Sequence, residues 1–357
     1  MVDWFKIASK LGKRVRISLI MHGLWAAVLW LVMFGGEPLY AGDQVNVGTV
    51  QLKAKVLGVK FPVRLYYRTP IERVKLSRFG SWHMPVVKQT KKSMLESMQE
   101  SAAATGTDFF EEKYPLVVIS HGLGGSDWTH YVLVADLVAA GFIVAAPKHP
   151  YDLLRVGKIK QALARPQEFS AAIDVILKDE LFASVIDTNR IGAFGYSLGG
   201  YTVLAAAGGV AKFERVVEYC KLPASDPALC RYVKKPIGAK KSISYISGND
   251  KRIKTIVVAA PFGVIFSDLT EIKQPVLLYR VVDDKLLLYP NHAEHIHKLL
   301  PISHDYELIE DRTHYSFLTP FTKRVSIKPG IDFDNSKRMT FLKTINEQII
   351  QFFKKTL

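Results

Sequence analysis

Short apolar runs alternate with amphipathic segments along most of this chain. Residues 45–57 and 60–67 are rich in β-branched and aromatic side chains and are separated by Gly58, which predicts an antiparallel hairpin. Residues 116–119 form a continuous apolar run, as expected of a strand that is buried on both faces. The pattern therefore predicts a central sheet that an antiparallel hairpin opens.

After residue 130, helical and strand patterns alternate strictly. This order predicts a mostly parallel sheet with helices on both faces and right-handed crossovers. The predicted helices cover residues 131–140, 167–177, 198–207 and 291–300, and the predicted strands cover residues 142–146, 190–194, 253–259, 276–282 and 306–309.

Two insertions interrupt the alternation, and we expect them to lie over the candidate site. Residues 71–113 are irregular apart from a predicted helix at 92–103, and residues 211–250 carry both cysteines. Met94 and Met98 could present an apolar face to an acyl chain, as a mobile lid does. The alternative is that this stripe packs against the core, which is the commoner fate of apolar residues at helical spacing.

Residues 195–199, Gly-Tyr-Ser-Leu-Gly, lie between a predicted strand and a predicted helix. A serine hydroxyl is a poor nucleophile unless a base accepts its proton. A tight turn between strand and helix exposes the serine oxygen, and glycines two positions before and after it remove side chains that would collide. Ser197 is therefore the candidate nucleophile. The alternative is a chance pentapeptide, which the flanking strand and helix patterns disfavour.

Residues 120–125 form a glycine-rich loop directly after the buried strand pattern. Such a loop lets backbone N–H groups approach a substrate closely and stabilise the oxyanion that forms during ester cleavage. We expect the N–H groups of Leu123 and Leu198 to be the two donors. His121 is interpreted as a structural hydrogen-bonding residue of this loop and not as the catalytic base.

The candidate acid and base follow later strands. Asp283 and Asp284 come directly after residues 276–282, and one carboxylate is enough to orient a histidine and stabilise its imidazolium. Asp284 is preferred because it lies nine residues after Pro275, the spacing usual for such an acid, and Asp283 stays open. His314 follows the last predicted strand and is the candidate base.

Four histidines cluster near the C-terminal part of the sheet: His292, His295, His297 and His304. A metal site is one interpretation, and a solvated helix face is the other. No carboxylate is positioned among them as an obvious further ligand. We expect neither a metal nor another cofactor.

The N-terminus is basic and then apolar. Lysines and arginines precede an apolar run over residues 17–34, and a helix-breaking Gly-Gly-Glu-Pro then leads to Leu-Tyr-Ala, which ends at Ala41. This layout predicts that residues 1–41 are a signal peptide cleaved after Ala41. An uncleaved membrane anchor is the alternative, because the run is near the lower length limit for crossing a bilayer. Both interpretations place the catalytic domain, residues 42–357, outside the cytoplasm, in the periplasm or secreted.

Charge and cysteine content add to this picture. The chain has 48 Lys and Arg against 33 Asp and Glu, a net charge of +15 that could attract anionic lipid or envelope polymers. No Arg-rich helix or interleaved aromatic stripe is present in the sequence, so no nucleic-acid partner is expected. Cys220 and Cys230 are the only cysteines. Because an exported chain meets an oxidising compartment, we predict that they form a disulfide.

Several segments together resemble a known family. Residues 120–125, 145–150, 194–202, 250–261 and 314–318 resemble bacterial proteins predicted to be dienelactone hydrolases, in the platelet-activating-factor acetylhydrolase-like group of the α/β-hydrolase superfamily. The resemblance covers most of residues 45–320. It implies an α/β-hydrolase fold, a triad in the order Ser197, Asp284 and His314, no metal, and hydrolysis of short or oxidised acyl esters or related carboxylic esters. Lys148 stands where members of the group often have Asp.

The predicted function is a serine esterase that cleaves short-acyl or acetyl-phospholipid-like esters through an acyl-enzyme. Its expected partner is a small-molecule or lipid ester, with membrane association at the periphery or through the N-terminus. Two alternatives stay open. One is a non-catalytic binding module of the same fold at the cell envelope, and the other is a lipase or polyesterase that acts at an interface. The oligomeric state is not indicated.

Overall fold

The computed structural model describes residues 46–71, 76–79, 82–106, 108–150, 163–233, 248–320 and 334–357. The predicted signal peptide or anchor lies outside these residues and stays a prediction. Among the helices of the described ranges, none combines the length and the apolar character needed to cross a bilayer.

Within the described residues, ten strands form one sheet in the order β12-β11-β9-β7-β5-β6-β2-β1-β4-β3. The strands from β12 to β6 are parallel, and the hairpin β1–β2 joins them in antiparallel pairing. This confirms the predicted mostly parallel sheet and its opening hairpin. The strands are β1 (Val47–Val56), β2 (Val59–Arg68), β3 (Leu76–Phe79), β4 (Trp82–Lys88), β5 (Tyr114–Ser120), β6 (Ile143–Pro147), β7 (Ile186–Tyr196), β9 (Ile253–Ala259), β11 (Val276–Val281) and β12 (Asp305–Ile309).

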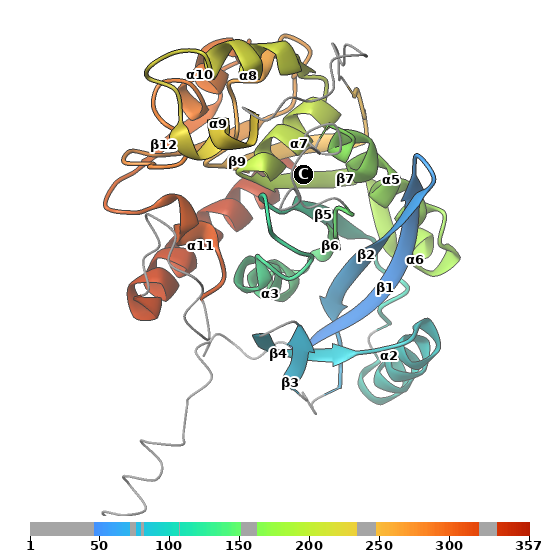
Figure 1. The fold of residues 1–357 in the computed structure, drawn as a ribbon. Coiled ribbons are helices and arrows are strands. Elements are labelled where there is room, and N and C mark those ends of the chain that lie inside the picture. The colour runs from blue at the N-terminus through green and yellow to red at the C-terminus, as the bar shows by residue number, and fades with distance from the viewer. Residues whose placement is uncertain are drawn as a thin grey trace, which may run out of the picture. The chain divides into compact units, whose positions relative to one another are not determined.

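Helices cover both faces of the parallel strands, as predicted. α5 (Arg165–Leu177) and α7 (Leu198–Ala206) pack against each other on one face, and α3 (Tyr131–Ala139) and α11 (Asn335–Thr356) pack on the other (Figure 1). Strands such as β5 and β9 are buried along most of their length, as expected where helices cover both faces of a sheet. The sequence pattern predicted the first three of these helices.

The C-terminal helix α11 was not predicted from the sequence pattern. Its side chains Phe341, Ile345, Ile349 and Phe353 are buried. β7 makes room for it at Gly192, where a Cβ would stand 2.6 Å from the Phe353 ring. The helix is therefore part of the core and not an appendage.

The expectation that residues 71–113 lie over the candidate site is wrong for their described part. β4 pairs with β1 and extends the sheet there, and four strands separate β4 from β7. The helix α2 (Lys91–Thr105) begins at a capping box formed by Thr90 and Ser93. Its Met94 and Met98 side chains are buried in the hydrophobic core. The stripe that suggested a lid is thus a packing face.

The second insertion contains two short helices and the predicted disulfide. α8 (Phe213–Tyr219) and α9 (Pro227–Val233) flank a turn that the Cys220–Cys230 bond closes, with sulfurs 2.02 Å apart. The strand β8 (Val210–Ala211), directly before α8, pairs with β10 (Phe266–Asp268) as a separate two-stranded sheet. The disulfide prediction is confirmed. Residues 234–247 of this insertion lie outside the described residues.

Candidate active site

Ser197 occupies a strained turn between β7 and α7. Its backbone has φ 55° and ψ −118°, a conformation that residues other than glycine rarely adopt. Three backbone hydrogen bonds hold it: the Ser197 N–H donates to Ala259 O at 3.0 Å, and Gly200 N and Phe262 N donate to Ser197 O at 2.9 Å each. Strain of this kind persists only where the surroundings enforce it. The turn leaves Ser197 partly exposed.

The glycines beside Ser197 are required by close backbone contacts. A Cβ on Gly195 would stand 2.3 Å from the carbonyl oxygen of Gly199. A Cβ on Gly199 would stand 1.9 Å from the carbonyl oxygen of Ser120, at the end of β5. Helix α7 therefore starts directly against the glycine-rich loop, and no larger residue fits at either position.

The three predicted triad side chains lie in one hydrogen-bonded chain. His314 Nε2 is 2.9 Å from Ser197 Oγ, and His314 Nδ1 is 2.6 Å from Asp284 Oδ2. His314 begins the short 3-10 helix η1 (His314–Phe317), and Asp284 follows β11. The Tyr196 hydroxyl donates to the backbone oxygen of His314 at 2.8 Å, which ties the histidine to the end of β7. The tertiary fold thus brings together residues separated by up to 117 positions.

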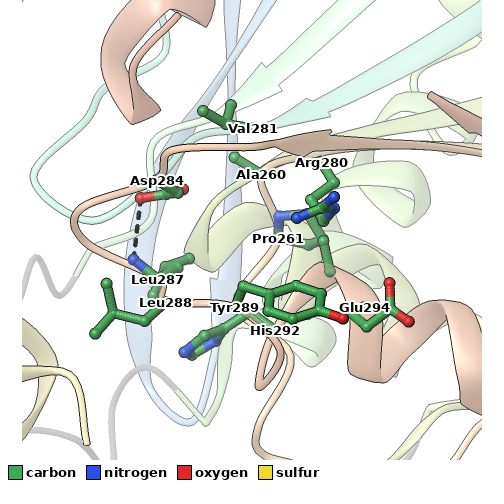
Figure 2. A pocket seen from close by; sticks show the side chains of 11 residues that line it. Ala260, Pro261, Arg280, Val281, Asp284, Leu287, Leu288, Tyr289, His292 and Glu294 are labelled. Atoms are coloured by element: carbon green, nitrogen blue, oxygen red, sulfur yellow. Dashed lines mark hydrogen bonds between the residues drawn. The ribbon is translucent and has the colours of Figure 1, made fainter. Parts of the chain in front are cut away.

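Asp284 is the carboxylate in contact with His314, and Asp283 is not. The Asp283 side chain is 77 % exposed and lies 3.9 Å from Lys285. Asp284 is buried, and its Oδ1 accepts hydrogen bonds from the N–H groups of Leu286 at 2.8 Å and Leu287 at 3.0 Å. Figure 2 shows the bond from Leu287. The geometry favours Asp284 over the alternative that the sequence left open.

The pKa of Asp284 is held below its ordinary value. Burial by itself would raise this pKa, but the nearby His314 ring and the two backbone N–H donors stabilise the carboxylate and outweigh burial. An ionised Asp284 accepts the hydrogen of His314 Nδ1, which leaves Nε2 free to accept a proton from Ser197.

The glycine-rich loop lies beside Ser197. The predicted role of the loop N–H groups as oxyanion donors requires this position. A Cβ on Gly122 would stand 3.3 Å from the Ser197 Cβ. Leu198 is the first residue of α7, so its N–H belongs to the helix end where backbone donors have no partner within the helix. Leu123 is 36 % exposed. The assignment of the Leu123 and Leu198 N–H groups as oxyanion donors stays a prediction.

The four clustered histidines have separate hydrogen-bond partners. His292 is buried and its Nε2 contacts Asp226, while His295 Nε2 is 2.9 Å from Phe266 O. His297 Nδ1 is 2.8 Å from His304 Nε2. No set of three His, Cys, Asp or Glu side chains within the described ranges is arranged to hold a metal ion. His292 does not fit the solvated helix face either, because it is buried.

Asp226 joins the disulfide-bearing insertion to the loop that carries Asp284. Its Oδ1 accepts from Leu288 N at 2.9 Å, and its Oδ2 contacts His292 Nε2. His292 Nδ1 in turn accepts from Gly263 N at 3.2 Å. Figure 2 shows Asp284, Leu288 and His292 along this loop, which lines a small cavity. The insertion thus braces the acid loop, a role that the sequence analysis missed.

A second group that the sequence analysis missed lies behind the glycine-rich loop. Ser120, His149, Arg165 and Glu168 are all buried. Ser120 Oγ is 3.0 Å from His149 Nε2, and His149 Nδ1 is 2.7 Å from Glu168 Oε2. A sequence signal for this group was a charged pair one helical turn apart, Arg165 and Glu168, at the start of α5.

Comparisons with known proteins agree with this architecture. A family model described as platelet-activating factor acetylhydrolase, isoform II, matches residues 74–168. A chicken (Gallus gallus) platelet-activating factor acetylhydrolase is 25 % identical over 226 residues, which cover 44 % of this chain and 54 % of the relative. The chain therefore spans about half the length of the curated relative that it matches.

This chain has the α/β-hydrolase fold and resembles the platelet-activating-factor acetylhydrolases. The family match covers the glycine-rich loop, β6 and the start of α5, and it ends before Ser197. The family match therefore rests on the part of the chain that surrounds the loop, and the elbow geometry is an independent observation.

Proposed function

We propose that this protein is a serine hydrolase of carboxylic esters that works through an acyl-enzyme. The observation that carries the proposal is the hydrogen-bonded chain from Asp284 through His314 to Ser197. The likeness to acetylhydrolases supports ester cleavage as the reaction. The partly exposed Ser197, at the end of β7 and in contact with a glycine-rich loop, is where an acyl group would be attacked.

The mechanism follows from these contacts. Ser197 Oγ bonds to the ester carbonyl carbon while its proton moves to His314 Nε2. The ionised Asp284 stabilises the imidazolium, and the N–H groups of Leu198 and Leu123 stabilise the oxyanion. The carbon–oxygen bond to the alcohol then breaks, and the alcohol leaves with the proton from His314. Water repeats the sequence, giving its proton to His314 and releasing the acid and free Ser197.

For the substrate, we propose a short-acyl or acetyl-phospholipid-like ester. The name of the chicken relative supports an acetyl group on a lipid, and the basic composition supports an anionic lipid or envelope setting. We further propose that the protein is exported, to the periplasm or beyond, with residues 1–41 as signal or anchor. The Cys220–Cys230 disulfide supports an oxidising compartment.

The decisive test is hydrolysis of nitrophenyl esters from acetate to laurate by the full-length chain and by Ser197→Ala. The wild type should be active with rates that fall as the acyl chain lengthens. Ser197→Ala should lose at least about 10⁴-fold in kcat, because the nucleophile is gone. Its thermal unfolding temperature should stay close to that of the wild type.

Other outcomes separate the alternatives. Full activity of Ser197→Ala would refute the nucleophile. Rates that rise with acyl length would favour a lipase or polyesterase at an interface. No hydrolysis of any ester, with both proteins folded, would favour a non-catalytic binding module of the same fold.

A further inference from the structure

A buried arginine holds the glycine-rich loop from behind. Arg165 lies in the first turn of α5 and is 1 % exposed. Its Nη1 donates to His121 O at 2.9 Å, and its Nη2 donates to Gly122 O at 3.4 Å. Burying a guanidinium is costly unless its donors are used. Here two of them are used on consecutive carbonyls of the loop that contacts Ser197.

These two bonds control where the loop N–H groups point. In a trans peptide the C=O and the N–H point in opposite directions. The peptide that carries Gly122 O also carries Leu123 N–H, so an arginine that holds this oxygen turns the Leu123 N–H away from itself. From this geometry we infer that Arg165 is a positioning residue, which aims the Leu123 N–H at the oxyanion. The inference rests on the proposed esterase function.

His121 reinforces the same carbonyl. The backbone N–H of His149 donates to His121 Nε2 at 3.3 Å. Nε2 of the His121 ring is therefore the acceptor, and its Nδ1 carries the hydrogen. That hydrogen is directed at Gly122 O, 2.7 Å away. Burial, and then the charge of Arg165, lowers the pKa of His121 well below its ordinary value, so the ring stays neutral. Since both atoms carry hydrogens, the 3.1 Å approach of Arg165 Nη2 to His121 Nδ1 is a contact between donors.

Gly122 O is thus approached by three donors, from Arg165, His121 and Gly125 N, the last at 3.2 Å. A carbonyl oxygen has two lone pairs, and these three donors occupy both of them. Rotation of this peptide group would break these hydrogen bonds, so the group has almost no freedom to rotate. Hydrogen bonds to its oxygen also polarise the group and strengthen Leu123 N–H as a donor. Arg165 supplies the only formal charge among the three.

The Ser120, His149 and Glu168 chain is a second layer of this support and not a second active site. It has the residue types of a triad, but Ser120 is 0 % exposed, His149 3 % and Glu168 2 %. No substrate reaches it. Glu168 lies one helical turn after Arg165. The start of α5 therefore holds the glycine-rich loop through Arg165 and holds His149, which contacts that loop, through Glu168.

The test is a double-mutant cycle with Arg165→Lys and Leu123→Pro in the full-length chain. Lysine keeps the charge but cannot reach two carbonyls as a fork, and proline removes the Leu123 N–H. Arg165→Lys should lower kcat about 30-fold and Leu123→Pro about 100-fold, with KM changed less than about threefold. The double variant should be within about threefold of Leu123→Pro, because Arg165 acts through the group that proline removes.

A second readout does not depend on turnover. An alkylboronic acid accepts Ser197 Oγ on boron and carries a hydroxyl where the oxyanion would lie. Its Kd should rise in Arg165→Lys by about the same factor as kcat falls, as for a transition-state analogue. Arg252→Met is the matched control. Arg252 pairs with Asp250 and with Asp174 of α5, the helix that carries Arg165, both at 2.7 Å. It should lower stability while kcat and the boronic acid Kd stay within about twofold.

Two results would overturn the inference. The first is a double variant whose loss is the product of the two single losses. The second is an Arg165→Lys protein with wild-type kcat and Kd. A wild type that neither hydrolyses esters nor binds the boronic acid would instead refute the proposed function, and the role of Arg165 with it.

Discussion

The two sides of Ser197 are held in different ways. On the oxyanion side, residues 120–125 depend on close glycine contacts and on buried polar groups, chiefly Arg165 and His149. On the acid side, the loop with Asp284 is braced by Asp226, which lies inside the loop that the disulfide closes. Both cysteines of the chain are on that side. The oxyanion side therefore has no covalent support.

This difference teaches which substitutions each side tolerates. A buried charge network stabilises one geometry but loses much when one member changes, because its partners are left unpaired. A disulfide mainly restricts the unfolded chain, so the native contacts around it remain when it is removed. We expect single changes on the oxyanion side to affect catalysis, and loss of the cross-link on the acid side to affect stability.

The largest effect should come from the acid itself. Asp284→Asn should lower kcat about 10⁴-fold, because an amide cannot hold the required His314 tautomer or stabilise its imidazolium. Asp283→Asn should stay within about threefold of wild type, since that side chain is exposed and lies away from His314. Steady-state kinetics on nitrophenyl acetate would compare them, and the reverse ranking would show that Asp283 is the acid.

Gly199→Ala tests the glycine contacts of the oxyanion side. The added Cβ would lie 1.9 Å from Ser120 O, so either the loop or the elbow must move. We expect kcat to fall about 100-fold and stability to fall by about 3 kcal/mol. Gly58→Ala is the control: its φ is +83° but no atom lies within 4 Å, so it should cost about 1 kcal/mol without affecting kcat. Equal kcat losses in both variants would contradict the steric explanation.

Removal of the disulfide tests the acid side. Cys220→Ser with Cys230→Ser should lower the free energy of unfolding by about 3 kcal/mol, measured by urea denaturation. At 25 °C kcat should change less than about threefold, because Asp226 still bonds Leu288 and His292. A loss of kcat comparable to that of Gly199→Ala would mean that the acid side depends on its cross-link for geometry as well as for stability.

The smallest effect is a pH dependence from the buried network. Burial raises the pKa of Glu168 to about 7, although Arg165 opposes the shift. Between pH 6 and 8 Glu168 loses a proton in the folded protein, whereas in the unfolded chain it has already lost it. The contribution of Glu168 to the free energy of unfolding therefore falls as pH rises. The change is about 1.4 kcal/mol over that range.

Glu168→Gln should abolish that part of the pH dependence. The pKa of the neighbouring His149 is well below its ordinary value, owing first to burial and then to Arg165, so His149 stays neutral throughout pH 6–8. Urea denaturation at pH 6, 7 and 8 should show the variant gaining stability relative to wild type as pH rises. Parallel curves for the two proteins would refute the shifted pKa of Glu168.

Much of the fold was predictable because its signals are local. The hairpin β1–β2, the buried strand β5 and the alternation from α3 to β12 follow from hydrophobic periodicity and from glycine and proline punctuation. The helix α2 was predicted as a helix but placed wrongly, since periodicity reveals an apolar face without saying what covers it. The sheet edge that β3 and β4 extend was not visible in the pattern for the same reason.

The candidate site also has features with local sequence signals and features that depend on long-range contacts. By itself the sequence indicated the candidate nucleophile elbow, the glycine-rich loop, the candidate base His314 and a choice of two aspartates, because each follows directly from a strand end and its neighbours. Only the tertiary structure decided that Asp284 faces His314, that Arg165 holds the loop and that Asp226 braces the acid. These pairings join segments 30, 44 and 62 residues apart. Their energies depend on burial and distance, which the order of residues does not contain.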